Sequence, residues 1–162
     1  MVNPDETLSI SAAQGVAWNV FTPPEILDEL VVDLDITVQR GIAWNPNTSV
    51  ETLIKLATSK DWNVRKGVVY NINTPVNILI ERADDIDIDV RVGVAWNINT
   101  PVTALIKLVD DVDVAPLDDL LVRNGVLKNP NCPEAVKIWF RMGGFAGMTL
   151  AEFVEKVNNG LL

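Results

Sequence analysis

Apolar residues of this chain recur in blocks that are separated by a nearly constant interval. Each block begins with glycine, continues through mostly apolar residues and ends with asparagine. The first four follow one another at steps of 26 residues and the fifth after a step of 32, at residues 15–19, 41–45, 67–71, 93–97 and 125–129. Such self-similarity is typical of repeat proteins, which bury apolar faces by stacking one repeat on the next.

Each repeat is predicted to hold two helices. The shorter one begins after an aspartate, Asp35, Asp61 or Asp87, whose carboxylate can accept hydrogen bonds from the first N–H groups of the helix. Apolar residues four positions apart, such as Val64 and Val68, give this helix one buried face. It is expected to end at the repeated asparagine, because asparagine tolerates the left-handed backbone conformation that terminates helices.

The longer helix of each repeat is predicted to begin at a threonine. In the second repeat Thr48 is followed three residues later by Glu51, which is the spacing of a capping box. Leu53 and Leu56 then supply an apolar stripe. In the other repeats the threonine position is filled by Thr22, Thr74, Thr100 and Cys132. Proline follows this position in four of the five repeats, at the place where a helix tolerates it best.

These helices are too short to be stable alone, so each must bury its apolar face against a neighbouring repeat. We therefore predict one all-α domain over residues 1–162, an α-solenoid of about five helical-pair repeats. An N-terminal capping helix, the repeats and a C-terminal cap are expected at residues 1–14, 15–142 and 143–162.

The sequence departs from the repeat pattern in two places. Extra residues around 113–119 separate the last two glycine blocks and are expected to lengthen a loop. After Met142 a glycine-rich segment interrupts the helical pattern, and Thr149 with Glu152 then forms a second capping-box spacing. A final helix is expected from there to about Asn158.

The repeat also resembles a known family. The run Val64-Arg65-x-x-Val68-Val69-x-Asn71-x-Asn73-Thr74-Pro75 is similar to the signature of the leucine-rich repeat variant family, as is the run from Val90 to Pro101. The resemblance covers about residues 9–141 and implies a right-handed superhelix of paired helices, without a single common activity. The 26-residue spacing exceeds that of the family. The cysteine cluster that holds an iron–sulfur centre in a founding member has no counterpart here, so that function does not carry over.

Composition narrows the functional classes. The formal net charge is −9, from 22 acidic and 13 basic residues, which argues against direct binding to nucleic acid. The chain has no histidine, the commonest general base and metal ligand, so we expect a protein that is not an enzyme and binds no metal or cofactor. It has no apolar run long enough to span a membrane and no secretory signal. The single cysteine, Cys132, is compatible with the cytoplasm, where we place the protein.

An aromatic column is the first candidate functional feature. Its members occupy one repeated position: Trp18, Trp44, Tyr70 and Trp96, with Lys128 at the fifth place. A glycine lies three residues before each, one helical turn away: Gly15, Gly41, Gly67, Gly93 and Gly125. Glycine inside a helix costs up to about 1 kcal/mol relative to alanine, so its repetition indicates a close contact. Two interpretations remain open: the rings pack across neighbouring glycines as core, or they form a half-exposed surface that binds a partner.

Two polar columns accompany the aromatic column. The asparagines Asn19, Asn45, Asn71, Asn97 and Asn129 are predicted to cap helices and bond loop backbone, with a ligand-binding role as the alternative. Arg65 and Arg91, with Arg123 and Gln39 at matching places, are predicted to form ion pairs or to flank the aromatic column as interface anchors.

Acidic loops form the last candidate feature. They are predicted to be helix caps on a solvated edge, with an acidic ridge for a basic partner as the alternative. The members are Asp33, Asp35, Asp84, Asp85, Asp87, Asp89, Asp110, Asp111, Asp113, Asp118 and Asp119. The spacing of Asp85, Asp87 and Asp89 is similar to that of a calcium loop, which also requires a glycine and a closing glutamate that are absent here.

The functional prediction is a non-catalytic scaffold that binds a protein or peptide through Trp18, Trp44, Tyr70 and Trp96, with Arg65 and Arg91 beside them. The alternative is an acidic edge that docks a basic protein or mimics nucleic acid. Self-association of two copies through the aromatic column is a further option.

Overall fold

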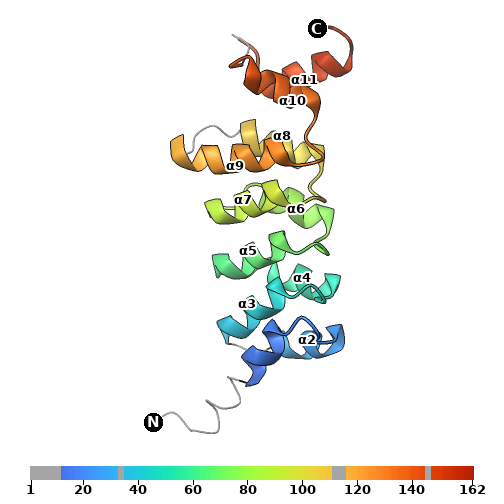
Figure 1. Ribbon diagram of the computed structural model, residues 1–162, viewed down its shortest axis with the longest axis vertical. Helices are drawn as coiled ribbons and strands as arrows, with labels where there is room; N and C mark the ends of the chain where they lie inside the picture. The colour runs from blue at the N-terminus through green and yellow to red at the C-terminus, as the bar shows by residue number, and fades with distance from the viewer. Residues whose placement is uncertain (1–11, 33–34, 111–115, 145–146) are drawn as a thin grey trace. The chain divides into compact units, whose positions relative to one another are not determined.

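A computed structural model describes residues 12–32, 35–110, 116–144 and 147–162 of the chain (Figure 1). Within these ranges the regular structure is entirely helical and no strand is found, which confirms the all-α class. Residues 12–18 are helical. The helices that follow are α2 (Pro24–Leu30), α3 (Ile36–Trp44), α4 (Val50–Leu56), α5 (Trp62–Tyr70), α6 (Val76–Arg82), α7 (Ile88–Trp96), α8 (Val102–Asp110), α9 (Pro116–Lys128), α10 (Glu134–Arg141) and α11 (Leu150–Asn158). None of the helices in these ranges has the length and apolar character needed to cross a membrane.

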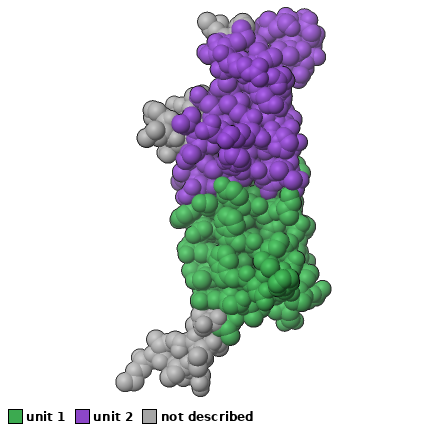
Figure 2. Space-filling view, in the orientation of Figure 1, with its two compact units in different colours: residues 1–78 green, residues 79–162 purple. Residues whose placement is uncertain are grey.

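The chain divides into two compact units, Met1–Ile78 and Leu79–Leu162 (Figure 2). In the first unit α3 packs against α5, the corresponding helix of the next repeat, and α4 contacts both. In the second unit α7 packs in the same way against α9, and α8 contacts both. The last helix, α11, packs against α8 and α10. Within each unit, therefore, helices one repeat apart in the sequence are neighbours.

The core consists of the apolar positions that the repeat pattern predicted. Val38 and Ile42 of α3 and Val64 and Val68 of α5 are fully buried. The other helix of each repeat contributes one fully buried leucine, at Leu27, Leu53, Leu79 and Leu105. Apolar spacing in the sequence was thus sufficient to identify the faces that pack.

Aspartates begin the helices at the predicted places. One carboxylate oxygen of Asp35 accepts a hydrogen bond from the Thr37 amide at 2.7 Å, and one of Asp61 accepts from the Val64 amide at 3.0 Å. Asp87 caps α7 in the same way. Each carboxylate satisfies an N–H group that has no partner within its own helix.

The threonines do not begin helices, contrary to the sequence prediction. The Thr48 hydroxyl donates to the carbonyl oxygen of Ile42 at 2.5 Å, and Ser49 caps α4 instead by accepting from the Thr52 amide. Thr22, Thr74 and Thr100 likewise donate to the carbonyl oxygens of Val16, Val68 and Val94. The hydroxyl therefore satisfies an end carbonyl of the preceding helix and closes the turn between the two helices.

The predicted helix lengths were also reversed in the second repeat. The aspartate-capped helix α3 has nine residues, whereas α4 has seven. The turn contributes to this difference, because it includes Thr48 and α4 therefore begins one residue later than predicted, after Ser49.

The insertion and the C-terminus differ in how well they were predicted. Residues 116–119 belong to the 13-residue helix α9, so this part of the insertion extends a helix rather than a loop. Residues 113–115 lie outside the described part of the chain.

At the C-terminus the capping box of Thr149 and Glu152 is present and α11 ends at Asn158, as predicted. Gly143 and Gly144 have φ values of 71° and 84°, which side chains disfavour and which separate α10 from α11.

The repeated asparagines cap helices, but not in the left-handed conformation that the sequence predicted. Asn45 follows α3 with φ −73° and ψ 127°, which is extended backbone. Its side-chain oxygen accepts from the Asn47 amide, while its side-chain NH₂ donates to the carbonyl oxygens of Ala17 and Asn19 at 2.8 and 2.9 Å. The amide side chain thus fixes its own turn and bonds the preceding repeat.

The same bonds recur along the first asparagine column. Asn71 donates to the carbonyl oxygens of Ala43 and Asn45, and Asn129 donates to those of Ala95 and Asn97. The members Asn45, Asn71, Asn97 and Asn129 are all buried. The buried side chains of Asn45, Asn71 and Asn129 therefore provide polar contact between consecutive repeats where water is excluded.

A second asparagine column, not identified from the sequence, lies two residues further along the chain. Asn47 donates to the carbonyl oxygens of Val20 and Thr22 at 2.8 and 3.0 Å. Asn73 and Asn131 make the corresponding bonds to the turn of the repeat before them. The signal was the second asparagine in Asn45-x-Asn47, Asn71-x-Asn73, Asn97-x-Asn99 and Asn129-x-Asn131. Within each unit, the side-chain NH₂ groups of the two columns thus hydrogen-bond successive turns to one another.

Replacement of Asn45 tests the importance of the buried column. We expect Asn45→Ala to lower the free energy of unfolding by about 2–3 kcal/mol, because buried backbone carbonyls lose their donor and cannot reach water. Asn47→Ala is the matched control: it removes the same number of donated bonds from a more exposed site and should cost about 1 kcal/mol. Urea unfolding followed by circular dichroism measures both, and equal losses would contradict a special role of the buried column.

Candidate interaction surface

The aromatic column lies at the C-terminal ends of helices and is half-exposed. Trp18 retains 50% of its accessible surface, Trp44 and Tyr70 each retain 37%, and Trp96 retains 43%. Trp44 is the last residue of α3, and Tyr70 is the last residue of α5. Each ring therefore has one side in the protein and another in solvent.

The buried side of Trp18, Trp44 and Trp96 lies against a glycine of the next repeat. A Cβ atom on Gly41 would lie 2.9 Å from Cβ of Ala17 and 3.0 Å from Cδ1 and Nε1 of Trp18. Gly67 has the same relation to Trp44, at 2.9 and 3.0 Å from the same two ring atoms. In the second unit Gly125 lies equally close to Trp96. The close contact that the repeated glycines predicted is confirmed at these positions.

Both interpretations of the aromatic column therefore hold in part. The Trp44 and Tyr70 rings stack, with centroids 5.3 Å apart and planes at 22°. In the second unit Lys128 occupies the next place in the column, and its Nζ lies 5.5 Å from the centroid of the Trp96 ring. The rings serve as packing between repeats while keeping a fixed, exposed edge.

Exposed apolar residues of the turns extend this surface in the first unit. Val20 and Ile72 follow the asparagines Asn19 and Asn71 and are about half exposed, at 53% and 49%. Pro46 occupies the same place in the second repeat and is exposed. The second asparagine column joins these turns, since Asn47 bonds the carbonyl of Val20. We define the aromatic strip as Trp18, Val20, Trp44, Pro46, Tyr70 and Ile72.

The arginines at the candidate sites bond loop backbone, a role that the sequence did not predict. Arg65 is only 8% exposed, and its Nη1 donates to the carbonyl oxygens of Ser59 and Lys60 at 2.9 and 3.1 Å. Arg91 donates in the same way to the carbonyl oxygens of Asp85 and Ile86. Each guanidinium is thus directed at the turn before its own helix, where it satisfies backbone carbonyls, and a role in partner binding stays a prediction.

An ion pair joins consecutive repeats on the helix that carries Trp44. Arg40, four residues before Trp44, contacts Asp61 with Nη2 2.6 Å from the nearer carboxylate oxygen and Nε 3.1 Å from the other. The hydrogen bonds from Arg40 lower the pKa of the Asp61 carboxyl group, and the Val64 amide adds to this effect. The paired geometry neutralises the Arg40 charge beside the aromatic strip.

In the acidic loop of the second unit, aspartate carboxylates accept hydrogen bonds from backbone amides. Asp85 is buried, accepts from the Asp87 amide at 3.0 Å and contacts Arg82 at 3.3 Å. Asp87 accepts from the Asp89 amide. Among the described residues no group of three or more acidic, cysteine or histidine side chains is arranged to hold a metal. Asp33, Asp111 and Asp113 lie outside the described residues.

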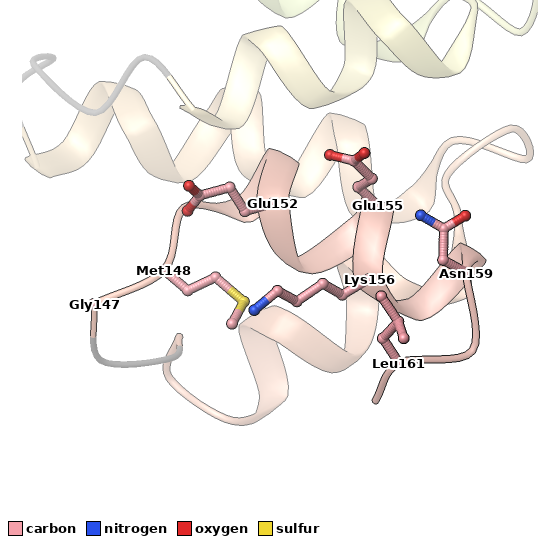
Figure 3. A pocket seen from close by; sticks show the side chains of 7 residues that line it. All are labelled: Gly147, Met148, Glu152, Glu155, Lys156, Asn159 and Leu161. Atoms are coloured by element: carbon pink, nitrogen blue, oxygen red, sulfur yellow. The ribbon is translucent and has the colours of Figure 1, made fainter.

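Two hollows lie near the C-terminus. One, of about 330 Å³, lies beside α11 and is lined by Met148, Glu152, Glu155 and Lys156, among others (Figure 3). Glu152 is bonded to Thr149, and these hydrogen bonds lower the pKa of its carboxyl group. The other hollow, of about 480 Å³, is lined by aromatic and apolar residues with Arg123, whose guanidinium lies 4.7 Å from the Phe140 centroid. Neither lining set pairs a nucleophile with a general base.

Comparisons with known proteins identify no relative of this chain. No family model matches the chain, and neither curated proteins nor solved structures give a match.

Glycine replacement tests the contact beneath the rings. Gly67→Ala should lower the free energy of unfolding by about 1–3 kcal/mol, because the added methyl group would lie 2.8 Å from Cβ of Ala43 and overpack the site. Gly15→Ala is the matched control, since its methyl group would meet nothing within 4 Å, and it should raise stability by up to about 1 kcal/mol. Thermal and urea unfolding measure both changes. A stabilising Gly67→Ala would show that the ring does not constrain this position.

The Arg40–Asp61 pair predicts a dependence of stability on pH. Because the pKa of Asp61 is lower in the folded protein than in the unfolded chain, its stabilisation is complete above the unfolded pKa and is lost as the pH falls through the folded value. We expect the free energy of unfolding to fall more steeply below about pH 4 in the wild type than in Asp61→Asn. Arg40→Gln removes the main cause and should flatten the profile as well. An unchanged profile in Arg40→Gln would assign the dependence to other carboxylates.

Proposed function

We propose that this protein is a non-catalytic interaction scaffold that binds a protein or peptide through the aromatic strip. The observation that carries this proposal is the combination of exposure and rigidity in the rings. Trp44 is held by Gly67 on one side and by the Tyr70 ring on another, yet 37% of its surface remains in solvent. Contiguous exposed apolar surface of this kind marks interaction sites, in which tryptophan and tyrosine are favoured anchors.

We further propose that the two units belong to one right-handed α-solenoid of about five repeats with α11 as its C-terminal cap, as in the leucine-rich repeat variant family. The recurrence of the asparagine bonds and glycine–indole contacts in both units supports this architecture. Such stacks offer extended surfaces on which equivalent residues of successive repeats contact one partner.

The acidic edge is the weaker candidate. In the described part of the acidic loop, Asp85 and Asp87 already accept backbone hydrogen bonds, and Asp84 is paired with Lys107. Their carboxylates therefore have local structural roles that the sequence also predicted.

A charge placed beside the rings tests the scaffold without removing their packing. In a pull-down from native lysate, the double variant Val20→Glu/Ile72→Glu should lose partners that the wild type retains, because both side chains are exposed within the strip. The matched control is Val50→Glu/Ile54→Glu, which changes two exposed apolar residues on α4 instead. Circular dichroism must show that both variants fold.

The outcomes separate the candidate surfaces. Loss of partners only in the first double variant supports the aromatic strip. Retention in both variants assigns binding to another surface, such as the acidic edge, and contradicts the proposal. If the retained protein is a second copy of the chain, the strip is a self-association surface.

A further inference from the structure

Trp18 and Trp44 in the first unit each contact a glycine through a particular edge of the indole ring. The atoms of Trp18 and Trp44 that lie against Gly41 and Gly67 are Cδ1 and Nε1, which belong to the five-membered ring. This edge carries the only hydrogen-bond donor of an indole. The six-membered ring is therefore the part of each indole farther from the glycine contact, and it carries no polar group of its own. Apolar groups and cations are the partners that the π surface of such a ring attracts.

The chain itself places an ammonium group on this kind of surface. At the fifth place of the aromatic column Lys128 replaces an aromatic residue, and its Nζ lies 5.5 Å from the centroid of Trp96. On α5 the Nζ of Lys66 lies 5.5 Å from the centroid of Trp62. In both cases the separation is within the range of an attractive cation–π contact. A lysine can thus occupy the position that Tyr70 occupies over Trp44.

Charge favours a cation over a neutral apolar group as the occupant. The chain carries a formal net charge of −9, and acidic residues outnumber basic ones within residues 1–78 as well. Arg40, the cation on the helix of Trp44, is paired with Asp61 at 2.6 Å. The long-range field therefore attracts a basic segment, and the Arg40 guanidinium, being paired with Asp61, does not oppose it.

We propose that the aromatic strip binds a basic peptide segment, whose lysine or arginine side chains lie over the six-membered rings of the half-exposed Trp18 and Trp44. This inference rests on the proposed function, since it names the partner class of the same surface. The alkyl stems of these side chains would cover Val20 and Pro46, while the charged groups contact the π faces.

The probe is a short fluorescent peptide of alternating lysine and glycine, compared with the same peptide in which every lysine is acetylated. Acetylation keeps the length and removes the charge. With the full wild-type chain at low salt, fluorescence anisotropy should show binding of the first peptide at least about fivefold tighter than the second. Trp44→Leu should weaken binding of the lysine peptide by about threefold to fivefold.

The matched control is Trp62→Leu, which removes another half-exposed tryptophan outside the strip and should leave affinity unchanged. Because Trp44→Leu also removes packing on Gly67, circular dichroism must show that it folds. If Trp44→Leu unfolds, Trp18→Leu takes its place, because Trp18 is the other ring of the proposed contact and is 50% exposed.

Each remaining outcome overturns the inference in a distinguishable way. Equal binding of both peptides, with the same dependence on Trp44, would mean that the strip binds apolar groups. This result would support the proposed function and overturn the inference that the partner is basic. Binding of the lysine peptide that is insensitive to Trp44 and lost in moderate salt would assign it to exposed carboxylates and overturn the inference, while leaving the scaffold to the pull-down. Absence of binding by either peptide would overturn the basic partner, while the pull-down with Val20→Glu/Ile72→Glu still tests the scaffold.

Discussion

The buried asparagine side chain is the interaction on which the stacking of these repeats depends. A helix must satisfy its end carbonyls, and a repeat protein must also define how each helix end meets the next one. The side chain of Asn45 does both, because its oxygen accepts from its own turn while its NH₂ bonds the carbonyls of Ala17 and Asn19. Apolar contacts alone would allow the helices to slide, whereas these bonds fix their register. The nearly constant position of asparagine in the sequence follows from this double role.

Once the turns are fixed, the geometry of the aromatic column follows. The helix ends approach so closely that only a glycine fits beside the Ala17 methyl group and the Trp18 ring, and Gly41 fills that place. The Trp18 side chain is packed against Gly41 on one edge and still keeps half of its surface in solvent. The cost of a glycine within a helix is thus offset by burial of the inner part of a large ring. Packing and exposure of the aromatic column have one cause.

Local rules predicted some features from sequence and failed for others. Asp61 as a cap and Val64 and Val68 as core follow from residue type and spacing within one helix, and the structure confirms them. Thr48 was assigned to the wrong helix because the same residues satisfy both a capping box and a turn-closing hydroxyl. The choice depends on the carbonyl of Ile42, whose position the turn determines. The Arg65 guanidinium bonds two carbonyls of a preceding loop, and no periodicity in the sequence encodes the shape of that loop.

The aromatic column shows why two alternatives drawn from sequence need not exclude one another. Sequence patterns assign a residue to the core or to the surface, but an indole is large enough to belong to both. In the first unit this gives the rings a property that an ordinary surface tryptophan lacks: the contacts with Gly67 and Tyr70 hold Trp44 in one orientation before any partner arrives. A side chain that is already ordered loses little conformational entropy on binding. The constraint that holds the repeats together would therefore also lower the entropic cost of binding the partner that we propose for the aromatic strip.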